Sequence, residues 1–148
     1  MGMIRSLIDE NSEKKLFTVG INATVLDALK SMAESEAGSV LVSDRGKIVG
    51  IFTERDYARN VEIKGLKASE TKVSDLMTKN MVVIDPTESI QTALNLMQKF
   101  HIRHLPIIEN GVVLGVVSLR RLTEALLAEH KETIVSLENY IMGTGYQS

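Results

Sequence analysis

Two short stretches carry side chains that could hold a ligand. Residues 50 to 56 read GIFTERD, and residues 115 to 121 read GVVSLRR. In the first stretch Thr53 and Asp56 place a hydroxyl and a carboxylate three positions apart after an apolar run. These two side chains either cap the start of a helix or grip a ligand. The second stretch keeps the glycine and the hydroxyl but ends in Arg121, which has no hydrogen-bond acceptor.

Both stretches belong to a longer duplication with a shift of 65 residues. The apolar positions match throughout without a gap, although few residues are identical. The matched pairs include Ala28-Leu29 with Ala93-Leu94, Met32 with Met97, Gly46 with Gly111, Gly50 with Gly115, Thr53 with Ser118 and Arg55 with Arg120. Chance rarely keeps such spacing over an entire helix-strand-turn-strand-helix unit. The sequence therefore predicts two copies of one fold.

The elements that must position these side chains follow from the periodicity. Apolar residues at helical spacing predict helices over Val25 to Met32 and Ile90 to Phe100, with Asn22 or Thr24 and Thr87 or Ser89 as caps. Two β-rich runs joined by a glycine turn predict one hairpin in each copy, over Ser39 to Phe52 and His104 to Val117. Further helices are expected over Glu54 to Ile63 and from Leu119 onward. Leading strands are expected at Leu16 to Val19 and Met81 to Ile84.

The last helix is expected to run from Leu119 to about Met142, longer than a globule of this size needs. Its apolar positions make it either a dimer surface or a helix that packs back on its own chain; they are Leu122, Leu126, Ile134, Leu137 and Ile141. We expect a homodimer. The whole chain divides into an N-terminal segment (1–15), two repeats (16–72 and 73–128) and a C-terminal helix extension (129–148).

Composition narrows the class of protein. The 148 residues are 44% hydrophobic with a net charge of -2, which suits one globular module. No apolar run approaches the roughly 20 residues of a membrane span, so no membrane partner is expected. There is no cysteine, so nothing requires an oxidising compartment, and a cytoplasmic location is the default. Near-balanced charge and six aromatic residues, three Phe and three Tyr, argue against a nucleic-acid partner.

The paired motifs resemble the tandem cystathionine-β-synthase-type (CBS) domain pair, or Bateman module. The likeness rests on Val73-Ser-Asp-Leu-Met77, Ile102-Arg-His-Leu-Pro-Ile-Ile108, GIFTERD and GVVSLRR, and it covers about residues 16 to 128. The resemblance implies an α+β fold of two β-α-β-β-α repeats packed face to face with approximate twofold symmetry. It also implies a stand-alone regulatory module, not an enzyme, that binds an adenine nucleotide in energy sensing. AMP is favoured over ADP and ATP, and no catalytic cofactor or metal is implied.

The resemblance further implies two unequal sites. In the better one, Asp56 would hold the ribose of the nucleotide. Its other members would line the base pocket or face the phosphate: Ile51, Thr53, Arg55, Ile102, Arg103, His104, Pro106 and Arg120. The weaker site would use Gly38, Ser39, Ser118 and Arg121, with arginine where the ribose needs an acceptor. One good nucleoside site per chain is the expectation.

Four other readings stay open at this point. The pair could be a constitutive interaction and dimerisation module that holds an unidentified regulated protein with or without nucleotide. It could sense NAD or S-adenosylmethionine in place of an adenine mononucleotide. His101 and His104 could bind a metal, but no cysteine or third ligand is nearby. An enzyme acting on a nucleotide has the least support, because the sequence shows no nucleophile elbow and no phosphate-binding glycine loop with a lysine.

Overall fold

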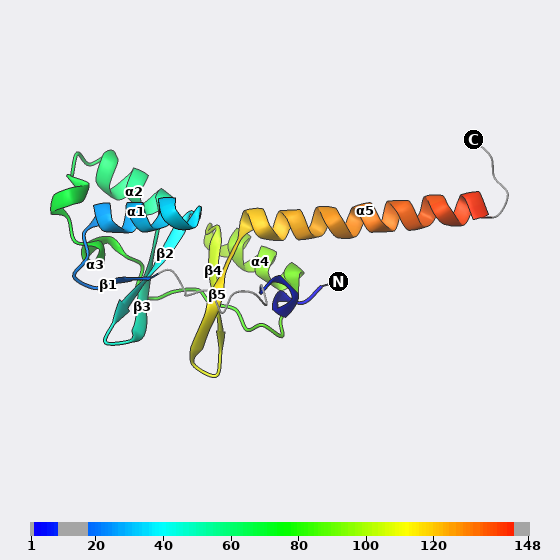
Figure 1. The fold of residues 1–148 in the computed structure, drawn as a ribbon, viewed down its shortest axis with the longest axis horizontal. Coiled ribbons are helices and arrows are strands. Elements are labelled where there is room, and N and C mark those ends of the chain that lie inside the picture. The colour runs from blue at the N-terminus through cyan, green and yellow to red at the C-terminus, as the bar shows by residue number, and fades with distance from the viewer. Residues whose placement is uncertain (1, 9–17, 144–148) are drawn as a thin grey trace.

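The structure, a computed structural model, describes the backbone of residues 2–8 and 18–143 and the side chains of these residues up to Lys131. Two repeats lie side by side, and a long helix leaves the second one (Figure 1). In chain order the elements are η1 (Ile4–Leu7), β1 (Thr18–Gly20), α1 (Val25–Ser35), β2 (Ser39–Asp44), β3 (Lys47–Thr53), α2 (Glu54–Tyr57), the π-helix η2 (Ala58–Glu62), η3 (Ala68–Glu70), α3 (Val73–Leu76), α4 (Ile90–Phe100), β4 (His104–Glu109), β5 (Val112–Ser118) and α5 (Leu119–Gly143).

The predicted duplication is confirmed in the element bounds. Helix α1 and helix α4 differ by 65 in both first and last residue, and so do the strands of the two hairpins. Each hairpin has a register shift at the corresponding place, between Val42 and Ser43 and between Ile107 and Ile108. The two repeats therefore share a backbone plan down to its irregularities.

Local chemistry explains where the repeated elements begin and turn. Thr24 caps α1 by accepting a hydrogen bond from the Asp27 amide (3.1 Å), and Ser89 caps α4 by accepting one from the Thr92 amide (3.0 Å). Of the alternatives in the sequence, Thr24 and Ser89 are thus the caps. Each hairpin turn holds two residues at positive φ, Arg45-Gly46 and Asn110-Gly111, which suits the twist of the flanking strands.

Each repeat has a hydrophobic core of its own between its helices and its sheet. In repeat one, sheet order β1-β2-β3 packs under α1, and Phe52 is fully buried there. In repeat two, the β4-β5 hairpin packs with α4 and the start of α5, and Leu105 and Leu122 are fully buried. The predicted α+β arrangement of two packed repeats is confirmed.

The segments that lead into the repeats pack crosswise. Ile4, near the N-terminus, is fully buried in the core of repeat two, and its amide donates to the Glu88 carbonyl (2.9 Å). Val73, the first residue of repeat two in sequence, is fully buried in the core of repeat one, and its amide donates to the Ala23 carbonyl (2.9 Å). The core of each repeat thus contains a buried residue from the segment with which the other repeat begins or which leads into it.

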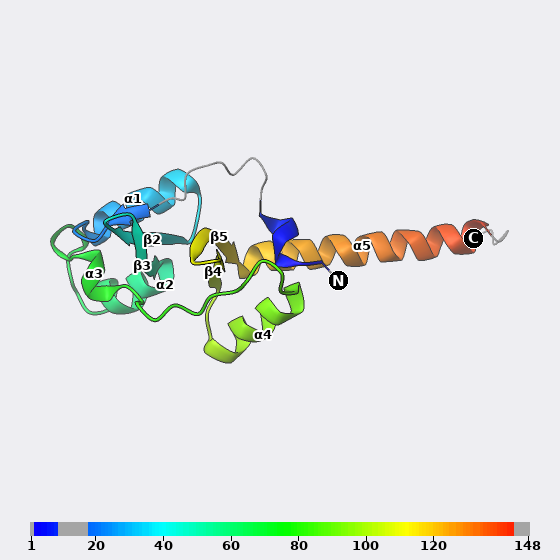
Figure 2. The same ribbon diagram turned by 90° about the horizontal axis from the view of Figure 1, so that it is seen from below.

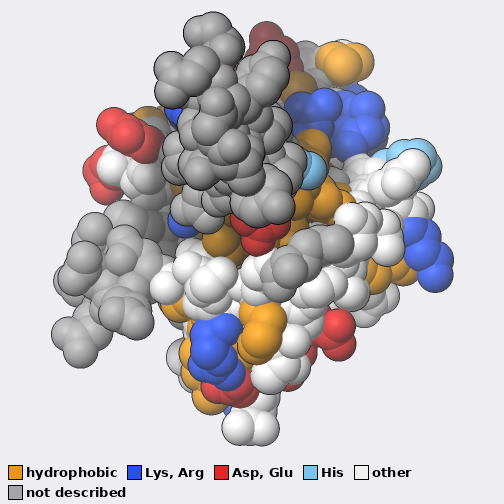
Figure 3. Space-filling view, turned by 90° about the vertical axis from the view of Figure 1, so that its right-hand side faces the viewer, with side chains coloured by type: hydrophobic (Ala, Val, Ile, Leu, Met, Phe, Trp, Pro, Cys, Tyr) orange, Lys and Arg blue, Asp and Glu red, His pale blue; other side chains and the backbone are white. Residues whose placement is uncertain are grey.

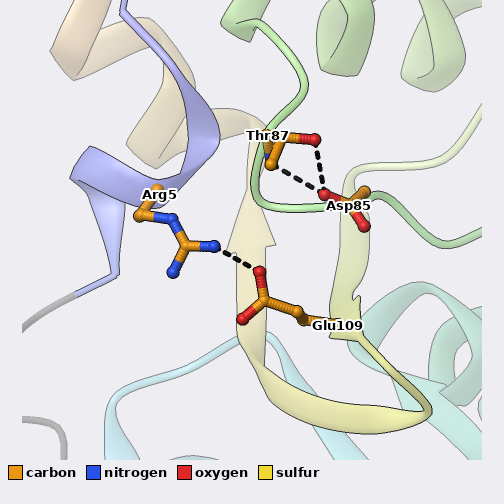
Figure 4. A network of polar contacts seen from close by, with 4 residues as sticks. All are labelled: Arg5, Asp85, Thr87 and Glu109. Carbon is orange, nitrogen blue, oxygen red and sulfur yellow. Dashed lines mark hydrogen bonds and ion pairs between the residues drawn. The ribbon is translucent and has the colours of Figure 1, made fainter.

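A polar network fastens the N-terminal segment to repeat two. The guanidinium of Arg5 pairs with the Glu109 carboxylate at the end of β4 (Figure 4). Beside it, Asp85 accepts hydrogen bonds from the amide (2.9 Å) and the hydroxyl (2.6 Å) of Thr87. These bonds, with Arg5 as a weaker electrostatic contributor, lower the pKa of the Asp85 carboxyl.

Helix α5 points away from repeat one in both ribbon views (Figures 1 and 2). Leu122 is fully buried and Leu126 is partly buried against repeat two, so the first turns of the helix pack on their own chain. The side chains of Ile134, Leu137 and Ile141 lie outside those that the structure describes. In the described part of the chain, no helix is long and apolar enough to cross a membrane.

Two element predictions need correction, and part of a third lies outside the described residues. Residues 81–83 form no strand, and only Ile84 makes a single parallel bridge, to Ile107. Strand β1 covers Thr18–Gly20, while the predicted start at Leu16 lies outside the described residues. The helix expected from Glu54 to Ile63 is a short α-helix that continues as the π-helix η2, because the apolar spacing in the sequence does not distinguish these two hydrogen-bond registers.

Candidate functional site

The motif GIFTERD forms the end of β3 and the start of α2. Thr53 is the N-cap: its hydroxyl accepts from the Asp56 amide (3.2 Å), and the Asp56 carboxylate accepts from the Thr53 amide (2.9 Å). This reciprocal pair satisfies two amides that a helix start would otherwise leave unbonded. The capping role considered for these residues is therefore present. Oxygen Oδ1 of Asp56 accepts no hydrogen bond from the described residues, so it is available to a ligand.

The motif GVVSLRR forms the same junction in repeat two, between β5 and α5. Ser118 accepts from the Arg121 amide (3.1 Å), but no bond returns, because a guanidinium cannot accept one. Arg120 instead pairs with Glu124 one turn along the helix (3.2 Å). The second junction is thus a half-satisfied copy of the first, with cations in place of a carboxylate.

Arg55 connects the two repeats directly. Its guanidinium donates to the His101 carbonyl (2.6 Å) at the C-terminal end of α4. A cation is favourable there, since the last carbonyls of a helix carry partial negative charge. The structure therefore gives Arg55 a partner in the protein itself, at the boundary between repeats.

The two repeats line a cavity of about 1170 Å³ that is open to solvent. Its walls come from both of them and from Leu7 and Ile8 of the N-terminal segment. Of the predicted site residues, the cavity is lined by Gly38, Ser39, Arg103, His104, Ser118, Arg120 and Arg121. It thus contains every member of the weaker predicted site and three members of the better one.

The remaining members of the better site lie elsewhere. Thr53 and Asp56 form the cap described above, Ile51 and Pro106 are buried, and Ile102 is packed against the core of repeat two. The residues that do not line the cavity are Ile51, Thr53, Arg55, Asp56, Ile102 and Pro106. Their assignment to a nucleotide stays a prediction.

The linker between the repeats packs against only one of the two paired glycines, Gly50 and Gly115. If residue 50 carried a Cβ atom, that atom would lie 2.6 Å from the Met77 sulfur and 3.0 Å from the Thr78 carbonyl oxygen. Thr78 also exchanges two backbone hydrogen bonds with Ile51 (2.9 and 3.0 Å). At the corresponding Gly115, no described atom lies within 4 Å of such a Cβ. The linker therefore covers the glycine of the first motif, whereas the described part of the chain leaves the second one open.

His104 lies in the cavity wall where the repeats meet. Its Nε2 atom is 3.0 Å from the position that a Cβ on Gly38 would take, so a larger residue at position 38 would crowd the imidazole. Burial lowers the pKa of His104, and Arg103 adds to this, while the carboxylates of Glu54 and Asp56 act in the opposite direction. The neutral imidazole is thus favoured next to two carboxylates of the other repeat.

Sequence reasoning missed the carboxylates of the cavity. Glu36 at the end of α1 and Glu54 at the start of α2 both line it from repeat one, and Glu124 lines it from α5. The arginines Arg103, Arg120 and Arg121 all come from repeat two. A signal for Glu54 was present in the sequence, since it lies within the motif GIFTERD itself, but only the fold shows which way it faces.

The face from which α5 projects carries charges of both signs. Among its described side chains, Lys and Arg alternate with Asp and Glu over the surface (Figure 3). A broad basic surface of the kind that binds nucleic acid is not what this face presents. The described residues also contain no group of three His, Asp or Glu side chains that could hold a metal ion.

Comparison with known proteins decides the family. Residues 7–62 and 73–128 each match the family model described as CBS domain. The chain belongs to the CBS domain family. It consists of a tandem CBS pair followed by α5, and pairs of this kind act as regulatory modules.

Individual relatives agree with this assignment. The chain is 37% identical over 128 residues to the mitochondrial CBS domain-containing protein CBSX3 of Arabidopsis thaliana, covering 83% of this chain and 62% of that protein. It therefore spans less than two thirds of that relative's length. A solved CBS-domain protein from Burkholderia ambifaria is 33% identical, with a TM-score of 0.81 over 86% of this chain and 95% of that one.

A more distant solved structure carries ligands. The CBS domain pair of protein MJ0100 is 19% identical, with a TM-score of 0.74 over 87% of this chain and 98% of that one. That pair was crystallised in complex with 5′-methylthioadenosine and S-adenosyl-L-methionine. At this identity the likeness concerns the fold alone. Because CBSX3 is named as mitochondrial, a cytoplasmic location for this chain stays a prediction.

Proposed function

We propose that this CBS pair binds an adenine nucleotide between its repeats and signals by a change in how they pack. The observation that carries the proposal is the cavity of about 1170 Å³ whose walls come from both repeats. Ligand sites usually measure about 300–1,000 Å³, so a nucleotide fits. A ligand that touches both repeats favours whichever packing suits it best, which is what a regulatory change requires.

The side chains around the boundary suit the parts of a nucleotide. Arginine donors from repeat two match phosphate oxygens, and carboxylates match ribose hydroxyls. AMP is our favoured ligand, with ADP and ATP next. NAD and S-adenosylmethionine are the alternatives, and the adenosyl ligands of MJ0100 support the wider class. The ligand acts as a regulator, with no catalytic role assigned.

Within this proposal the first motif remains the better nucleoside site, because Asp56 acts electrostatically on His104, which lines the cavity. Asp56 is half-buried and holds the Thr53 amide with one carboxylate oxygen only. The other oxygen accepts no hydrogen bond from the described residues and can accept one from a ribose hydroxyl. Ile51 would line the base pocket, and Ile102 and Pro106 would flank the adenine from repeat two. Arg55 would have to leave the His101 carbonyl, or share it, to reach a phosphate.

Calorimetric titration with AMP, ADP, ATP, NAD and S-adenosylmethionine tests the proposal. We expect at least one of them to bind below millimolar concentration. If none binds, the proposal is wrong. Asp56→Ala is expected to remove the site of the first motif, and Arg121→Ala to leave it nearly unchanged. A loss from Arg121→Ala with little change from Asp56→Ala would mean that the nucleotide is held by the cavity residues of repeat two instead.

A matched variant separates binding from helix capping at position 56. Loss of an N-cap interaction typically costs about 1 kcal/mol of stability, so Asp56→Ala also weakens the start of α2. Asp56→Asn keeps an oxygen that can accept from the Thr53 amide, but it loses the charge and one acceptor. We expect Asp56→Asn to lose nucleotide affinity while its free energy of unfolding stays closer to that of the wild type.

One observation favours a second candidate function, a constitutive interaction module. Helix α5 runs well beyond the two repeats, and Leu127 is 64% exposed on it. Such a helix suits a homodimer or a regulated protein partner. Light scattering of the purified chain tests the dimer. A dimer or partner complex whose affinity is the same with and without nucleotide would support this candidate over nucleotide sensing.

A further inference from the structure

His104 brings a titratable side chain to the boundary between the repeats. It is the first residue of β4, where it pairs with Ser118 of β5, and it lines the cavity. Histidine changes its charge closer to neutral pH than any other ordinary side chain. We propose that nucleotide binding is coupled to protonation of His104: the protein takes up a proton together with the nucleotide and binds it more tightly in mild acid than at neutral pH. The inference rests on the proposed function.

Repeat one surrounds the imidazole with negative charge. The Nε2 atom of His104 lies 3.0 Å, and the carboxyl carbon of Glu54 3.7 Å, from the position that a Cβ on Gly38 would take. The Glu54 amide donates to the Gly38 carbonyl (3.0 Å), which holds the start of α2 at this place. Asp56 acts on His104 from the same helix, and Glu36 lines the cavity from the end of α1. These carboxylates favour the imidazolium.

Repeat two and burial act in the opposite direction. Burial is the largest influence on His104, and the Arg103 guanidinium adds to it, so the pKa of His104 lies below 6.5. Arg120 and Arg121 line the same cavity from the start of α5, although Arg120 shares its charge with Glu124 (3.2 Å). In the free protein the imidazole is therefore neutral at neutral pH, with opposed charges on its two sides.

An anionic ligand changes this balance. Phosphate oxygens near Arg103 and Arg121 would offset the positive charge that disfavours the imidazolium, so the pKa of His104 would rise on binding. A ligand that raises the pKa of a group binds more tightly to its protonated form, by a factor of ten for each unit of the rise. Affinity should then increase as the pH falls through the interval between the free and bound values. Adenosine, which carries no phosphate, should produce little of this effect.

Calorimetric titration with ATP in two buffers of different ionisation enthalpy measures the proton uptake. At about pH 6.5 the wild type should take up more protons per bound ATP than His104→Gln, since the protonation of ATP itself is common to both. Between about pH 7.5 and about pH 5.5, ATP affinity should rise roughly 3-fold to 10-fold more in the wild type than in His104→Gln. His130→Gln is the matched control, because His130 is exposed on α5 and does not line the cavity.

A nuclear magnetic resonance titration of the imidazole protons reads His104 directly, and it needs no binding by the variant. The chain has three histidines, and the resonance that is missing in His104→Gln identifies His104. Its midpoint should rise when ATP is bound and stay nearly unchanged with adenosine. In the free protein Glu54→Gln should lower this midpoint, whereas Glu34→Gln, on the exposed side of α1 outside the cavity wall, should not.

Two outcomes separate failure of the inference from failure of the proposed function. If ATP binds but the His104 midpoint stays the same, and wild type and His104→Gln take up equal numbers of protons, the inference is overturned and the proposed function stands. If none of the nucleotides binds the wild type, the proposed function is overturned and the inference with it.

Discussion

The two CBS repeats have corresponding backbones but different clefts. Both run from a capped helix through a bulged hairpin to a helix that begins at a hydroxyl residue, Thr53 or Ser118. The first junction closes a reciprocal cap, and the linker packs against Gly50 shortly before it. The second closes half a cap and borders the cavity of about 1170 Å³. Duplication thus preserved the backbone, while the linker and the residues at positions 56 and 121 make the two junctions different.

The largest expected effect on stability comes from Ile4, which precedes repeat one in sequence but is buried in the core of repeat two. Ile4→Ala is expected to lower the free energy of unfolding by about 2–5 kcal/mol, because it leaves a void around a fully buried side chain. Hydrogen exchange should show faster exchange mainly in α4 and the β4-β5 hairpin, although Ile4 precedes repeat one in sequence. Ile4→Val, expected to cost about 0.5–1.5 kcal/mol, is the graded control. Equal deprotection of β2 and β3 would contradict the crosswise packing.

Substitution of Gly50 and of its counterpart Gly115 should give the next largest difference in the free energy of unfolding. Gly50→Ala is expected to cost about 1–3 kcal/mol, because its Cβ would press on Met77 and on the Thr78 backbone. Gly115→Ala is expected to stay within about 0.5 kcal/mol. Urea unfolding of both variants measures the two values. Similar losses at both positions would show that the second cleft is as closely covered as the first.

Substitution of Arg55 and of its counterpart Arg120 should give a smaller difference in the free energy of unfolding. Arg55→Ala removes the 2.6 Å bond to the His101 carbonyl between repeats, at an expected cost of about 0.5–1.5 kcal/mol. Arg120→Ala breaks only an exposed pair within α5, which is worth about 0.5 kcal/mol or less. Thermal unfolding of the two variants tests the order, and a larger loss for Arg120→Ala would reverse it.

The smallest expected effect is a pH dependence that comes from repeat two. His104 corresponds to Ser39, which does not titrate in this range. Burial lowers the pKa of His104 below 6.5, so the unfolded chain takes up a proton before the folded one does. This part of the stability is present above about pH 6.5 and declines as the pH falls below that value. The lowered pKa values of Asp27 and Asp85 act in a more acidic range.

His104→Gln provides the control for this pH effect. Melting temperatures between pH 5.5 and 7.5 should fall less steeply for the variant than for the wild type. If the two curves are parallel, His104 does not contribute to the acid-side loss, and the asymmetry between His104 and Ser39 has no effect on stability.

Several features of the fold could be predicted because they depend on residues close in sequence. Thr24 and Ser89 cap their helices, and the turns containing Gly46 and Gly111 join the hairpins as the local pattern indicates. The strand predicted at Met81 to Ile84 was wrong for the opposite reason. Its apolar residues favour a strand, but only Ile84 finds a partner, at Ile107, and pairing with a distant strand is not encoded in the run itself.

The sequence by itself determined the duplication, the elements of each repeat and the family. It also showed that Asp56 of the first motif corresponds to Arg121 of the second. These follow from periodicity, capping chemistry and residue identity. Only the tertiary structure decided that the linker covers Gly50, that Ile4 and Val73 cross between repeats, and that Glu54 faces the open cavity. Such features depend on which distant surfaces meet, and contacts of this kind arise only when both repeats have folded and packed together.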